Sequence, residues 1–566
     1  MRGAKGGCRQ VQKGTGLAAW NVQVRCEVQL HLRPNPSNMR QLMHMPHVAD
    51  IAPPAPNHAG PRLRVGKVCV AIQGGSPAEL MERAETALKD SRFLEFRLDF
   101  LPKPLAVLPY LRQFLAEHRD VTAIATCRRK AFGGGFDGNL VAELDVLSKA
   151  AQTGCQIVDL EVETAEECKP AQLARLRACG AALLISYHDF TRTKGLDQAA
   201  NRIEAFEPDF VKVVSTARTL ADNLAVLRLI EDRSMASQVV GIAMGEEGVV
   251  SRVLAPRAGA AFTFASFSEG TETAAGQVTA ETMRDLYRLE HVDQATRIFG
   301  VAGFPIAHSL SPLLHNAAFR RENVNAILLP LKVRTVADLM TLALELPLAG
   351  AAVTMPLKED VLPYLANMDP LTGKIGACNT LRTGADGKLY GFNTDVAGVV
   401  RPLERRIRLK GARVAVVGAG GAARAAVFGL VAQGAEVFVV NRTHDRAVTL
   451  ARQAKAKSLK HELLAKQHVD VLINSTPCGM PGVKPVLPIA ENELNATIVF
   501  DMVYNPIETP LLKLAKSRGA HVISGLAMFV QQAARQFEIW TGKPAPESEM
   551  MRVVEHELRK RAAQGS

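Results

Sequence analysis

The stretch Val414-Ala-Val-Val-Gly-Ala-Gly-Gly-Ala-Ala-Arg424 decides the fold of the C-terminal half. An apolar run meets Gly418, and an alanine-rich run follows Gly420, so the stretch predicts a strand, a tight turn and a helix. With Ala423 the spacing is G-x-G-x-x-A, which lets the backbone approach a pyrophosphate at a helix N-terminus. A glycine-rich turn without a ligand is the weaker alternative, because the strand and the helix are both present. We therefore predict a Rossmann domain.

The residues after the next apolar run, Glu436–Val440, indicate which dinucleotide binds. Proteins that bind NAD place an acid near this point to accept the ribose 2′-hydroxyl. This chain has Asn441-Arg442-Thr443 instead, followed by Arg446. Guanidinium groups suit a 2′-phosphate, so the sequence predicts NADP.

Polar residues ahead of the glycine stretch suit a small acidic substrate. Ser309 and Ser311 precede a predicted helix, where hydroxyls and free amides make a corner for a carboxylate. The alternative is an N-cap followed by a first-turn proline. Lys358 and Asp395 form a plausible proton relay for reducing a ketone with hydride from a nicotinamide. A surface ion pair is the alternative for that pair.

The first half has a different organisation, in which short apolar runs alternate with helical patterns. The runs are Val68–Ile72, Phe93–Leu98, Val121–Thr126, Gln156–Val162, Ala182–Tyr187, Phe210–Val214, Val239–Met244 and Ala261–Phe267. Eight β-α units in about 225 residues match a closed (β/α)8 barrel. An open doubly wound sheet is the alternative.

Charged and polar side chains stand at the ends of these runs, where a barrel carries its chemistry. They are Glu95, Arg97 and Asp99 in the second run, Arg128 after the third, Glu161 in the fourth, His188 after the fifth, Lys212 in the sixth, and Arg252 and Gln277 after the last two. Alternating charges also occur on exposed edge strands, but a closed barrel has no edge.

Lys212 lies in Asp-Phe-Val-Lys-Val-Val, a lysine within a buried strand. Such an ammonium is either paired or has a lowered pKa, with Arg97, Arg128 and Arg252 nearby to depress it. A lysine with a lowered pKa is the nucleophile for a Schiff base with a ketone, and His188 suits removal of the adjacent proton. The alternatives are a lysine that reaches the rim and a structural histidine.

Composition narrows the partners and the compartment. The 566-residue chain has a formal net charge of +12, but residues 1–66 hold nine Arg and Lys against two acids, with one Trp and no Tyr or Phe. That tail offers no stacking platform, so we predict no nucleic-acid partner. The nine cysteines form no metal-binding pattern and no signal peptide or membrane span is evident, so we expect no metal and a cytoplasmic location. A homodimer stays open.

Five segments of the first half resemble the type I 3-dehydroquinate dehydratases. They are Phe-Leu-Glu-Phe-Arg-Leu-Asp (93–99), Ser-Tyr-His-Asp-Phe (186–190), Val-Lys-Val (211–213), Val-Val-Ser-Arg (249–252) and Ala-Ala-Gly-Gln (274–277). The resemblance implies that Lys212 forms an imine with the substrate and that His188 removes the α-proton and assists loss of the hydroxyl. It places Glu95, Arg97, Arg128, Arg252, Thr273 and Gln277 around the substrate.

One position departs from that family. Its members usually carry Glu four residues after the arginine of strand three, beside the catalytic histidine, and this chain has Phe132 there. The loss would slow proton transfer unless another acid orients His188. We hypothesise that Glu161 or Asp189 does so.

Segments of the second half resemble the shikimate dehydrogenases. They include Gly376-Ala-Cys-Asn379-Thr, Asn474-Ser-Thr-Pro, Asp501-Met-Val-Tyr504-Asn-Pro and Gly525-Leu-Ala-Met528-Phe-Val-Gln-Gln532-Ala. The resemblance makes Lys358 the catalytic group, with Asp395 beside it. It assigns substrate binding to Ser309, Ser311, Thr354, Asn379, Asp395, Tyr504 and Gln532, and NADP binding to Gly418, Gly420, Gly421, Ala422, Asn441, Arg442, Thr443, Arg446, Met502, Gly525 and Met528. Ala352 and Cys378 replace the common Asn and Val, away from the proposed chemistry.

Together the two halves predict an α/β protein, a (β/α)8 barrel followed by a two-domain dehydrogenase. The expected parts are a disordered basic extension (1–63), the dehydratase barrel (64–290), the substrate domain (298–400), the Rossmann domain (401–524) and C-terminal helices that return to the substrate domain (525–566). The dehydratase product, 3-dehydroshikimate, would be the substrate that the dehydrogenase reduces to shikimate.

Three alternatives remain at this stage. The barrel could be a different Schiff-base lyase, or an inactive scaffold, which Phe132 would favour. The C-terminal half could oxidise quinate with NAD, although Arg442 and Arg446 argue against that.

Overall fold

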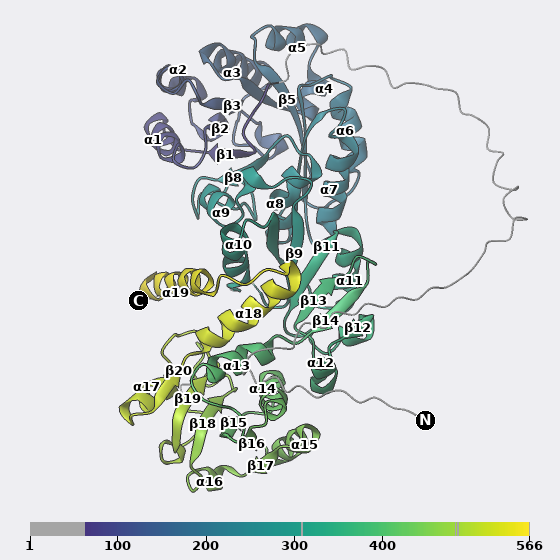
Figure 1. Cartoon of the computed structure of the whole chain (residues 1–566). Coiled ribbons are helices and arrows are strands. Elements are labelled where there is room, and N and C mark those ends of the chain that lie inside the picture. Colours follow the sequence, from purple (N-terminus) through teal and green to yellow (C-terminus); the bar gives the residue numbers. More distant parts are fainter. Residues whose placement is uncertain (1–62, 307–308, 482, 484–485, 565–566) are drawn as a thin grey trace, which may run out of the picture. The chain divides into compact units, whose positions relative to one another are not determined.

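The structure is a computed structural model that describes residues 63–564, except 307–308, 482 and 484–485 (Figure 1). The predicted basic extension lies outside the described residues, apart from Leu63 at its end. The described chain contains three sheets, one of eight strands and two of six. Each sheet is built from strands that are consecutive in the sequence.

The first sheet is a nearly closed parallel barrel. Its strands are β1 (Val68–Ile72), β2 (Phe93–Arg97), β3 (Thr122–Thr126), β4 (Ile157–Glu161), β5 (Ala182–His188), β6 (Phe210–Thr216), β7 (Gln238–Met244) and β8 (Thr263–Ser266). Strand β1 pairs in parallel with both β2 and β8, so the sheet curls round onto its first strand. This arrangement confirms the predicted barrel and excludes the open doubly wound sheet.

Helices connect the barrel strands and cover their outer face. They are α1 (Pro77–Ala87), α2 (Leu108–Glu117), α3 (Leu140–Thr153), α4 (Val162–Glu167), α5 (Pro170–Arg177), α6 (Leu196–Glu204), α7 (Ala221–Arg233), α8 (Val249–Ala258) and α9 (Ala280–Asp285). Inside the barrel, the ring of Phe262 lies 4.8 Å from that of Phe93 and 5.6 Å from that of Phe210. These rings fill the amino ends of the strands, so the charged side chains lie at the carboxyl ends.

The second sheet is mixed and begins the second half of the chain. Its strands are β9 (Arg297–Gly303), β10 (Ala326–Lys332), β11 (Leu348–Val353), β12 (Asn367–Met368), β13 (Thr380–Thr383) and β14 (Leu389–Phe392). The order is β10-β9-β11-β13-β14-β12, with β13 antiparallel to β11. Its helices are α10 (Ser311–Arg321), α11 (Val336–Glu345) and α12 (Pro370–Ile375), and α18 (Gly525–Thr541) and α19 (Glu547–Gln564) share a core with α10 and β9.

The third sheet is entirely parallel and has the order β17-β16-β15-β18-β19-β20. Its strands are β15 (Arg413–Val417), β16 (Glu436–Val440), β17 (Lys457–Leu459), β18 (Val469–Asn474), β19 (Ala496–Asp501) and β20 (His521–Ile523). The accompanying helices are α13 (Asp395–Glu404), α14 (Gly421–Ala432), α15 (His444–Ala454), α16 (His461–Leu464) and α17 (Pro510–Ser517). Numbered from β15, the order is 3-2-1-4-5-6, that of the Rossmann fold, whose ligands bind where the order reverses.

Within the described residues, no helix has the length and apolar character to cross a bilayer.

Candidate active sites

The carboxyl ends of the barrel strands enclose one pocket. Its lining contains all eight side chains that the sequence places around the dehydratase substrate. These are Glu95, Arg97, Arg128, His188, Lys212, Arg252, Thr273 and Gln277. The lining also includes apolar residues that the sequence did not single out, namely Val214, Ile242, Met244 and Phe264, and Phe190 in the loop after β5.

Lys212 is the lysine at the centre of this pocket, and it is 4% exposed. Its Nζ donates to Asp159 Oδ2 at 2.7 Å, lies 3.9 Å from Glu95 Oε1 and sits 4.2 Å from the centre of the Phe264 ring. The ammonium is therefore paired. Asp159 was missed by the sequence analysis, although Asp159 and Glu161 stand two apart in β4 and so face the same side, as Glu95 and Arg97 do in β2.

Two of the three arginines expected to depress the pKa of Lys212, Arg97 and Arg128, have acidic partners of their own. The Arg97 guanidinium donates to Asp99 at 2.9 and 2.7 Å. Arg128 lies 2.9 Å from Glu161 and 3.4 Å from Asp159. Four carboxylates, those of Glu95, Asp99, Asp159 and Glu161, lie near these cations. The structure thus shows a paired ammonium, one of the two outcomes that the sequence left open.

His188 is held by Glu161. Its Nδ1 lies 2.9 and 3.0 Å from the two Glu161 oxygens, and the Phe190 ring stacks on the imidazole at 5.8 Å. Burial and the charges of Arg128 and Lys212 hold the pKa of His188 well below its ordinary value. A neutral imidazole that donates from Nδ1 keeps its lone pair on Nε2, which is the form that a general base needs.

Of the two acids considered for orienting His188, the structure brings Glu161 to it. The Ser186 hydroxyl also donates to Glu161 at 2.8 Å, and Arg128 Nε forms an ion pair with it at 2.9 Å. Asp189 instead accepts from Thr191 and from the Arg192 amide, within its own loop. Burial raises the pKa of Glu161 to about 7.

Phe132, at the position of the missing glutamate, lies in a short 3-10 turn (Lys130–Phe132) outside the pocket lining. The Arg129 guanidinium covers its ring at 4.8 Å. Gly133, the next residue, does line the pocket and has φ +78, and a Cβ there would meet the Phe190 ring at 2.3 Å. The glycine therefore lets this loop approach the phenylalanine that stacks on His188.

Arg252 is the cation without an acidic partner in the described part of this pocket. It is 1% exposed, and its Nε and one terminal nitrogen have no hydrogen-bond acceptor. Burial lowers the pKa of this guanidinium to about 10. Because a buried unpaired charge is costly, the arrangement favours an anionic ligand at Arg252.

A second pocket lies in the dehydrogenase half and gathers the other predicted substrate residues. Its lining includes Ser309, Ser311, Thr354, Lys358, Asn379, Asp395, Tyr504 and Gln532. Four residues assigned to the cofactor, Ala422, Met502, Gly525 and Met528, line the same pocket. The substrate residues and the predicted nicotinamide neighbours therefore share one space.

Lys358 and Asp395 form an ion pair in this pocket, with 2.6 Å between Nζ and Oδ2. The other carboxylate oxygen, Oδ1, accepts from the Asn379 amide at 2.8 Å. Asp395 is 7% exposed, whereas the Lys358 side chain is 27% exposed. The pair is thus no surface contact, because its carboxylate is fixed from behind while the ammonium faces the pocket.

The glycine turn after β15 has the geometry of a dinucleotide site. Gly418 has φ +123, and a Cβ there would meet Ser475 Oγ at 2.3 Å. Gly420 and Gly421 face open space at the start of α14, so a phosphate can reach the helix amides. After β16, Arg442 and Arg446 are exposed and have no acidic partner among the described residues.

Asn441 and Thr443 complete this segment. The Asn441 side-chain amide donates to the Thr443 carbonyl at 2.8 Å, and Thr443 precedes α15. This contact fixes the turn that presents the two arginines. The residues present therefore fit a nucleotide that carries a 2′-phosphate.

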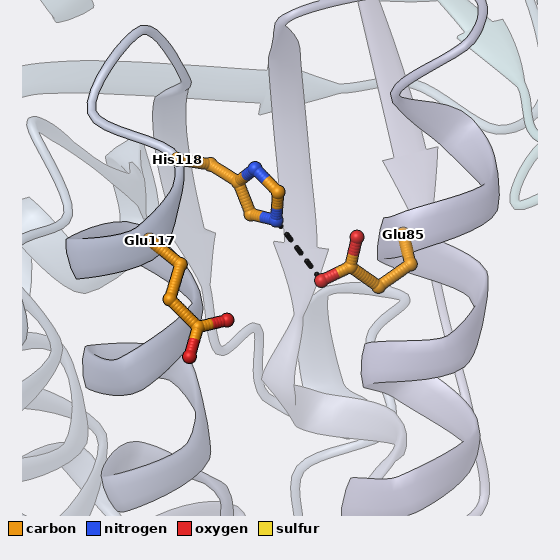
Figure 2. A group of neighbouring side chains, drawn as sticks. All are labelled: Glu85, Glu117 and His118. Carbon is orange, nitrogen blue, oxygen red and sulfur yellow. Dashed lines mark hydrogen bonds and ion pairs between the residues drawn. The ribbon is translucent and has the colours of Figure 1, made fainter.

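One group of described side chains has the spacing of metal ligands, namely Glu85, Glu117 and His118 (Figure 2). His118 Nε2 lies 3.0 Å from Glu85 Oε1. The group lies at the carboxyl ends of α1 and α2, where a barrel chain turns back to the amino ends of its strands. It is thus at the opposite end of the barrel from the pocket, and both glutamates are exposed.

Comparison with protein families gives matches along both halves. The type I 3-dehydroquinase model matches residues 68–294. The shikimate dehydrogenase substrate-binding domain matches 301–381, the shikimate/quinate 5-dehydrogenase model 402–491, and the shikimate 5'-dehydrogenase C-terminal domain 525–555. These matches confirm the expected pair of enzyme classes, a lyase followed by an oxidoreductase.

Individual relatives agree with this division. The chain is 33% identical to the chloroplastic bifunctional 3-dehydroquinate dehydratase/shikimate dehydrogenase of Arabidopsis thaliana, over 85% of this chain and 82% of that protein. It is 42% identical to the shikimate dehydrogenase (NADP(+)) of Methanosarcina acetivorans, over 46% of this chain and 97% of that protein. The pentafunctional AROM polypeptide of Yarrowia lipolytica is 31% identical over 80% of this chain and 30% of its own length.

The NADP(+) in the name of the archaeal relative agrees with the cofactor that the sequence predicts. The long match to the plant protein carries more weight for the whole chain, because it runs through both the barrel and the dehydrogenase half. The chain belongs to the family of bifunctional 3-dehydroquinate dehydratase/shikimate dehydrogenases.

Proposed function

We propose that the chain catalyses two successive reactions, dehydration of 3-dehydroquinate to 3-dehydroshikimate and NADPH-dependent reduction of that product to shikimate. The observation that carries the proposal is the pairing of sites in one chain. The barrel holds a buried lysine beside a neutral histidine, and the dehydrogenase pocket holds a Lys–Asp pair beside a dinucleotide turn. Family membership supports the same two activities.

In the barrel, Lys212 is the nucleophile. After the ammonium gives one proton to water, the free amine Nζ adds to the substrate ketone, and loss of water gives the imine, which acidifies the neighbouring C–H bond. His188 Nε2 takes that proton while Nδ1 donates to Glu161. The resulting enamine expels the hydroxyl group, which leaves as water after protonation by the imidazolium. Water then cleaves the imine, releases the product and restores Lys212.

Arg252 holds the substrate carboxylate in this proposal. Its buried guanidinium has free donors, and a carboxylate accepts two parallel N–H bonds from arginine. Glu95, Arg97, Arg128, Thr273 and Gln277 line the remaining pocket and contact the hydroxyl groups. Asp159 keeps Lys212 in position through the 2.7 Å bond.

In the dehydrogenase pocket, Lys358 supplies the proton. NADPH, when bound, provides the hydride for the ketone carbon. Lys358 Nζ donates to the ketone oxygen, so that the developing alkoxide is protonated as it forms. Asp395 orients the ammonium through its 2.6 Å bond, and Ser309, Ser311, Thr354, Asn379, Tyr504 and Gln532 surround the ring acid.

NADP is assigned to the glycine turn and its neighbours. Gly418, Gly420, Gly421 and Ala422 admit the pyrophosphate, and Asn441, Arg442, Thr443 and Arg446 receive the 2′-phosphate. Met502, Gly525 and Met528 flank the nicotinamide. The open space above Gly420 and Gly421 supports this assignment.

The domain boundaries remain part of the proposal. We place the dehydratase at 64–290, the substrate domain at 298–400, the Rossmann domain at 401–524 and the returning helices at 525–566. The shared core of α10, α18 and α19 supports the last assignment. A cytoplasmic location is supported by the seven described cysteines, all of which are free. The oligomeric state, monomer or homodimer, can be measured by light scattering.

The experiment follows both reactions in the purified chain. With 3-dehydroquinate alone, enone absorbance rises, and added NADPH is then consumed. Borohydride reduces an imine at Lys212 to a stable covalent adduct. We expect Lys212→Ala to form neither the enone nor this adduct but still to reduce supplied 3-dehydroshikimate. Lys358→Ala should form both the enone and the adduct but should not oxidise NADPH. No enone in the native chain would leave the barrel as a scaffold or a different lyase. Enone without NADPH oxidation would remove the second activity.

A further inference from the structure

A fully buried histidine lies behind the dehydrogenase pocket. His315 is 0% exposed and sits on α10 one turn after Ser311, which lines the pocket. Its ring centre lies 4.9 Å from that of Trp540 and 6.2 Å from that of Phe319. An apolar aromatic side chain could make the same ring contacts. These contacts therefore do not explain why the residue is a histidine with two polar ring nitrogens.

The hydrogen bonds of His315 fix its proton. His315 Nε2 lies 3.1 Å from Gln536 Oε1, while the Gln536 amide nitrogen donates to Thr380 Oγ1 at 3.1 Å and to the Asn379 carbonyl at 3.3 Å. Because Gln536 presents its oxygen to the ring, Nε2 carries the hydrogen. Burial lowers the pKa of His315 to about 4, and Nδ1 has no partner, as expected for a neutral ring.

From Gln536 the hydrogen bonds continue to the catalytic pair. Thr380 Oγ1 donates to Asn379 Oδ1 at 2.8 Å, and Asn379 Nδ2 donates to Asp395 Oδ1 at 2.8 Å. Asp395 Oδ2 accepts from Lys358 at 2.6 Å. All of these links except the final ion pair are between buried groups.

Each donor in this chain points toward Asp395. The Thr394 amide donates to Asn379 Oδ1 at 2.8 Å, so the Asn379 side chain cannot be reversed without placing two N–H groups face to face. Reversing Gln536 would set its side-chain oxygen against the Asn379 carbonyl, which can only accept. Aligned buried hydrogen bonds polarise one another, so the orientation set at His315 reaches the carboxylate.

We propose that His315 is a positioning residue for the Lys358–Asp395 pair, acting through Gln536, Thr380 and Asn379. The proposal rests on the proposed function, in which Lys358 gives the proton to the ketone. Gln536 also lines the pocket, so the same contact fixes the amide that faces the substrate. His315 itself does not touch the substrate.

The test compares two replacements of His315. His315→Leu removes the donor, while His315→Gln keeps an N–H near the place of Nε2. We expect kcat for reduction of 3-dehydroshikimate to fall about tenfold in His315→Leu, since a buried acceptor loses its donor, and to recover to within about threefold in His315→Gln. The KM for NADPH and the dehydratase rate stay native. If His315 serves packing alone, kcat of His315→Gln is no higher than that of His315→Leu, and that result overturns the proposal.

The middle of the chain offers an independent variant. Thr380→Val removes one hydroxyl with little change of shape and is expected to lower kcat by a similar factor, about tenfold. Thr383→Val is the matched control, because Thr383 lies on the same strand but donates to the Leu348 carbonyl, and it is expected to keep native activity. If His315→Leu fails to fold, the Thr380→Val and Thr383→Val comparison decides alone.

Coupling gives the final criterion. In a double-mutant cycle, His315→Leu and Thr380→Val together cost no more than either alone if they act through one chain. The pH profile of kcat is expected to shift in His315→Leu and in Thr380→Val and to stay native in His315→Gln. Additive losses with a native pH profile overturn the proposal. Native reduction by Lys358→Ala overturns the proposed function itself, whereas an inactive Lys358→Ala with native His315→Leu overturns only the positioning role.

Discussion

Replacing Glu161 by glutamine changes the group that orients the barrel histidine. In the native chain the carboxylate accepts from His188 Nδ1 and Ser186 at 2.8–3.0 Å and forms an ion pair with Arg128 at 2.9 Å. The amide of Glu161→Gln has nearly the same shape but is neutral, and its NH2 group faces a donor whichever way it turns. Two effects follow: the correct tautomer of His188 is less favoured, and the imidazolium loses its counter-charge.

The magnitude follows from the charge that forms on the histidine. When His188 takes the substrate proton, it becomes a cation whose Nδ1 lies 2.9 Å from the Glu161 carboxylate. Two unit charges about 4 Å apart interact by about 4 kcal/mol at an effective dielectric constant of about 20. Loss of that stabilisation in the transition state slows the reaction by about 1,000-fold.

The assay is the initial rate of enone formation from saturating 3-dehydroquinate. Asp189→Asn is the matched control, because this neighbouring acid contacts only its own loop, and its rate should stay within about threefold of native. Borohydride trapping at Lys212 and the dehydrogenase rate show that Glu161→Gln is folded. The reasoning is refuted if Glu161→Gln keeps more than about one tenth of the native rate, or if Asp189→Asn loses as much.

Four further outcomes follow from the structure. Because burial raises the pKa of Glu161 to about 7, the dehydratase kcat should fall as pH drops below about 7, where the protonated carboxyl no longer accepts the imidazole hydrogen. Phe132→Ala should leave that kcat within about twofold, as the ring lies outside the pocket. The double variant Arg442→Ala/Arg446→Ala should raise the KM for NADPH at least about tenfold. Its KM for NADH, which has no 2′-phosphate, should stay unchanged. Burial lowers the pKa of His315 from 6.5 to about 4, so the unfolded chain takes up the proton first. The dehydrogenase half should then lose about 3 kcal/mol of stability as pH falls from 6.5 to 4, as read from denaturant midpoints.

Local periodicity was enough to predict the barrel and the position of its chemistry. Alternate residues of a strand face one side, so Glu95 and Arg97 had to lie together, and Lys212 in a buried run had to face the interior or the rim. Asp99 lies beyond the end of β2 in a 3-10 turn (Leu98–Phe100) and meets Arg97 from there. The same reasoning applied to β4 would have predicted Asp159, because Asp159 and Glu161 follow the same alternation. That omission was a failure to apply the rule, since the signal was present.

The acid that contacts His188 could not be identified from the residues adjacent to it in the sequence. Asp189 is its neighbour in sequence, yet it turns into the loop and caps Thr191. Glu161 reaches the histidine because β4 and β5 pair in a register that sets Glu161 beside Ser186, two residues before His188 on the same face. A register is a property of the folded sheet, fixed by packing around the whole barrel, and so the sequence left both acids open.

The dehydrogenase half shows the same limit over a longer distance. The motif residues Lys358, Asn379 and Asp395 carried their own signal, but Thr380, Gln536 and His315 did not. His315 and Gln536 are 221 residues apart in the sequence. They meet because α18, which follows all six strands of the Rossmann sheet in the chain, packs against α10. A buried histidine is ordinarily explained as part of the core, and only the direction of its hydrogen bonds distinguishes the two interpretations.

The loss of a glutamate at Phe132 is consistent with an active barrel. A carboxylate at position 132 would stand next to three glycines (133–135), whereas Glu161 is 3% exposed, ends a strand and is held by Ser186, His188 and the Arg128 ion pair. Orientation of an imidazole depends on an acceptor that is itself held in place. Glu161 can therefore orient His188 without a glutamate at position 132.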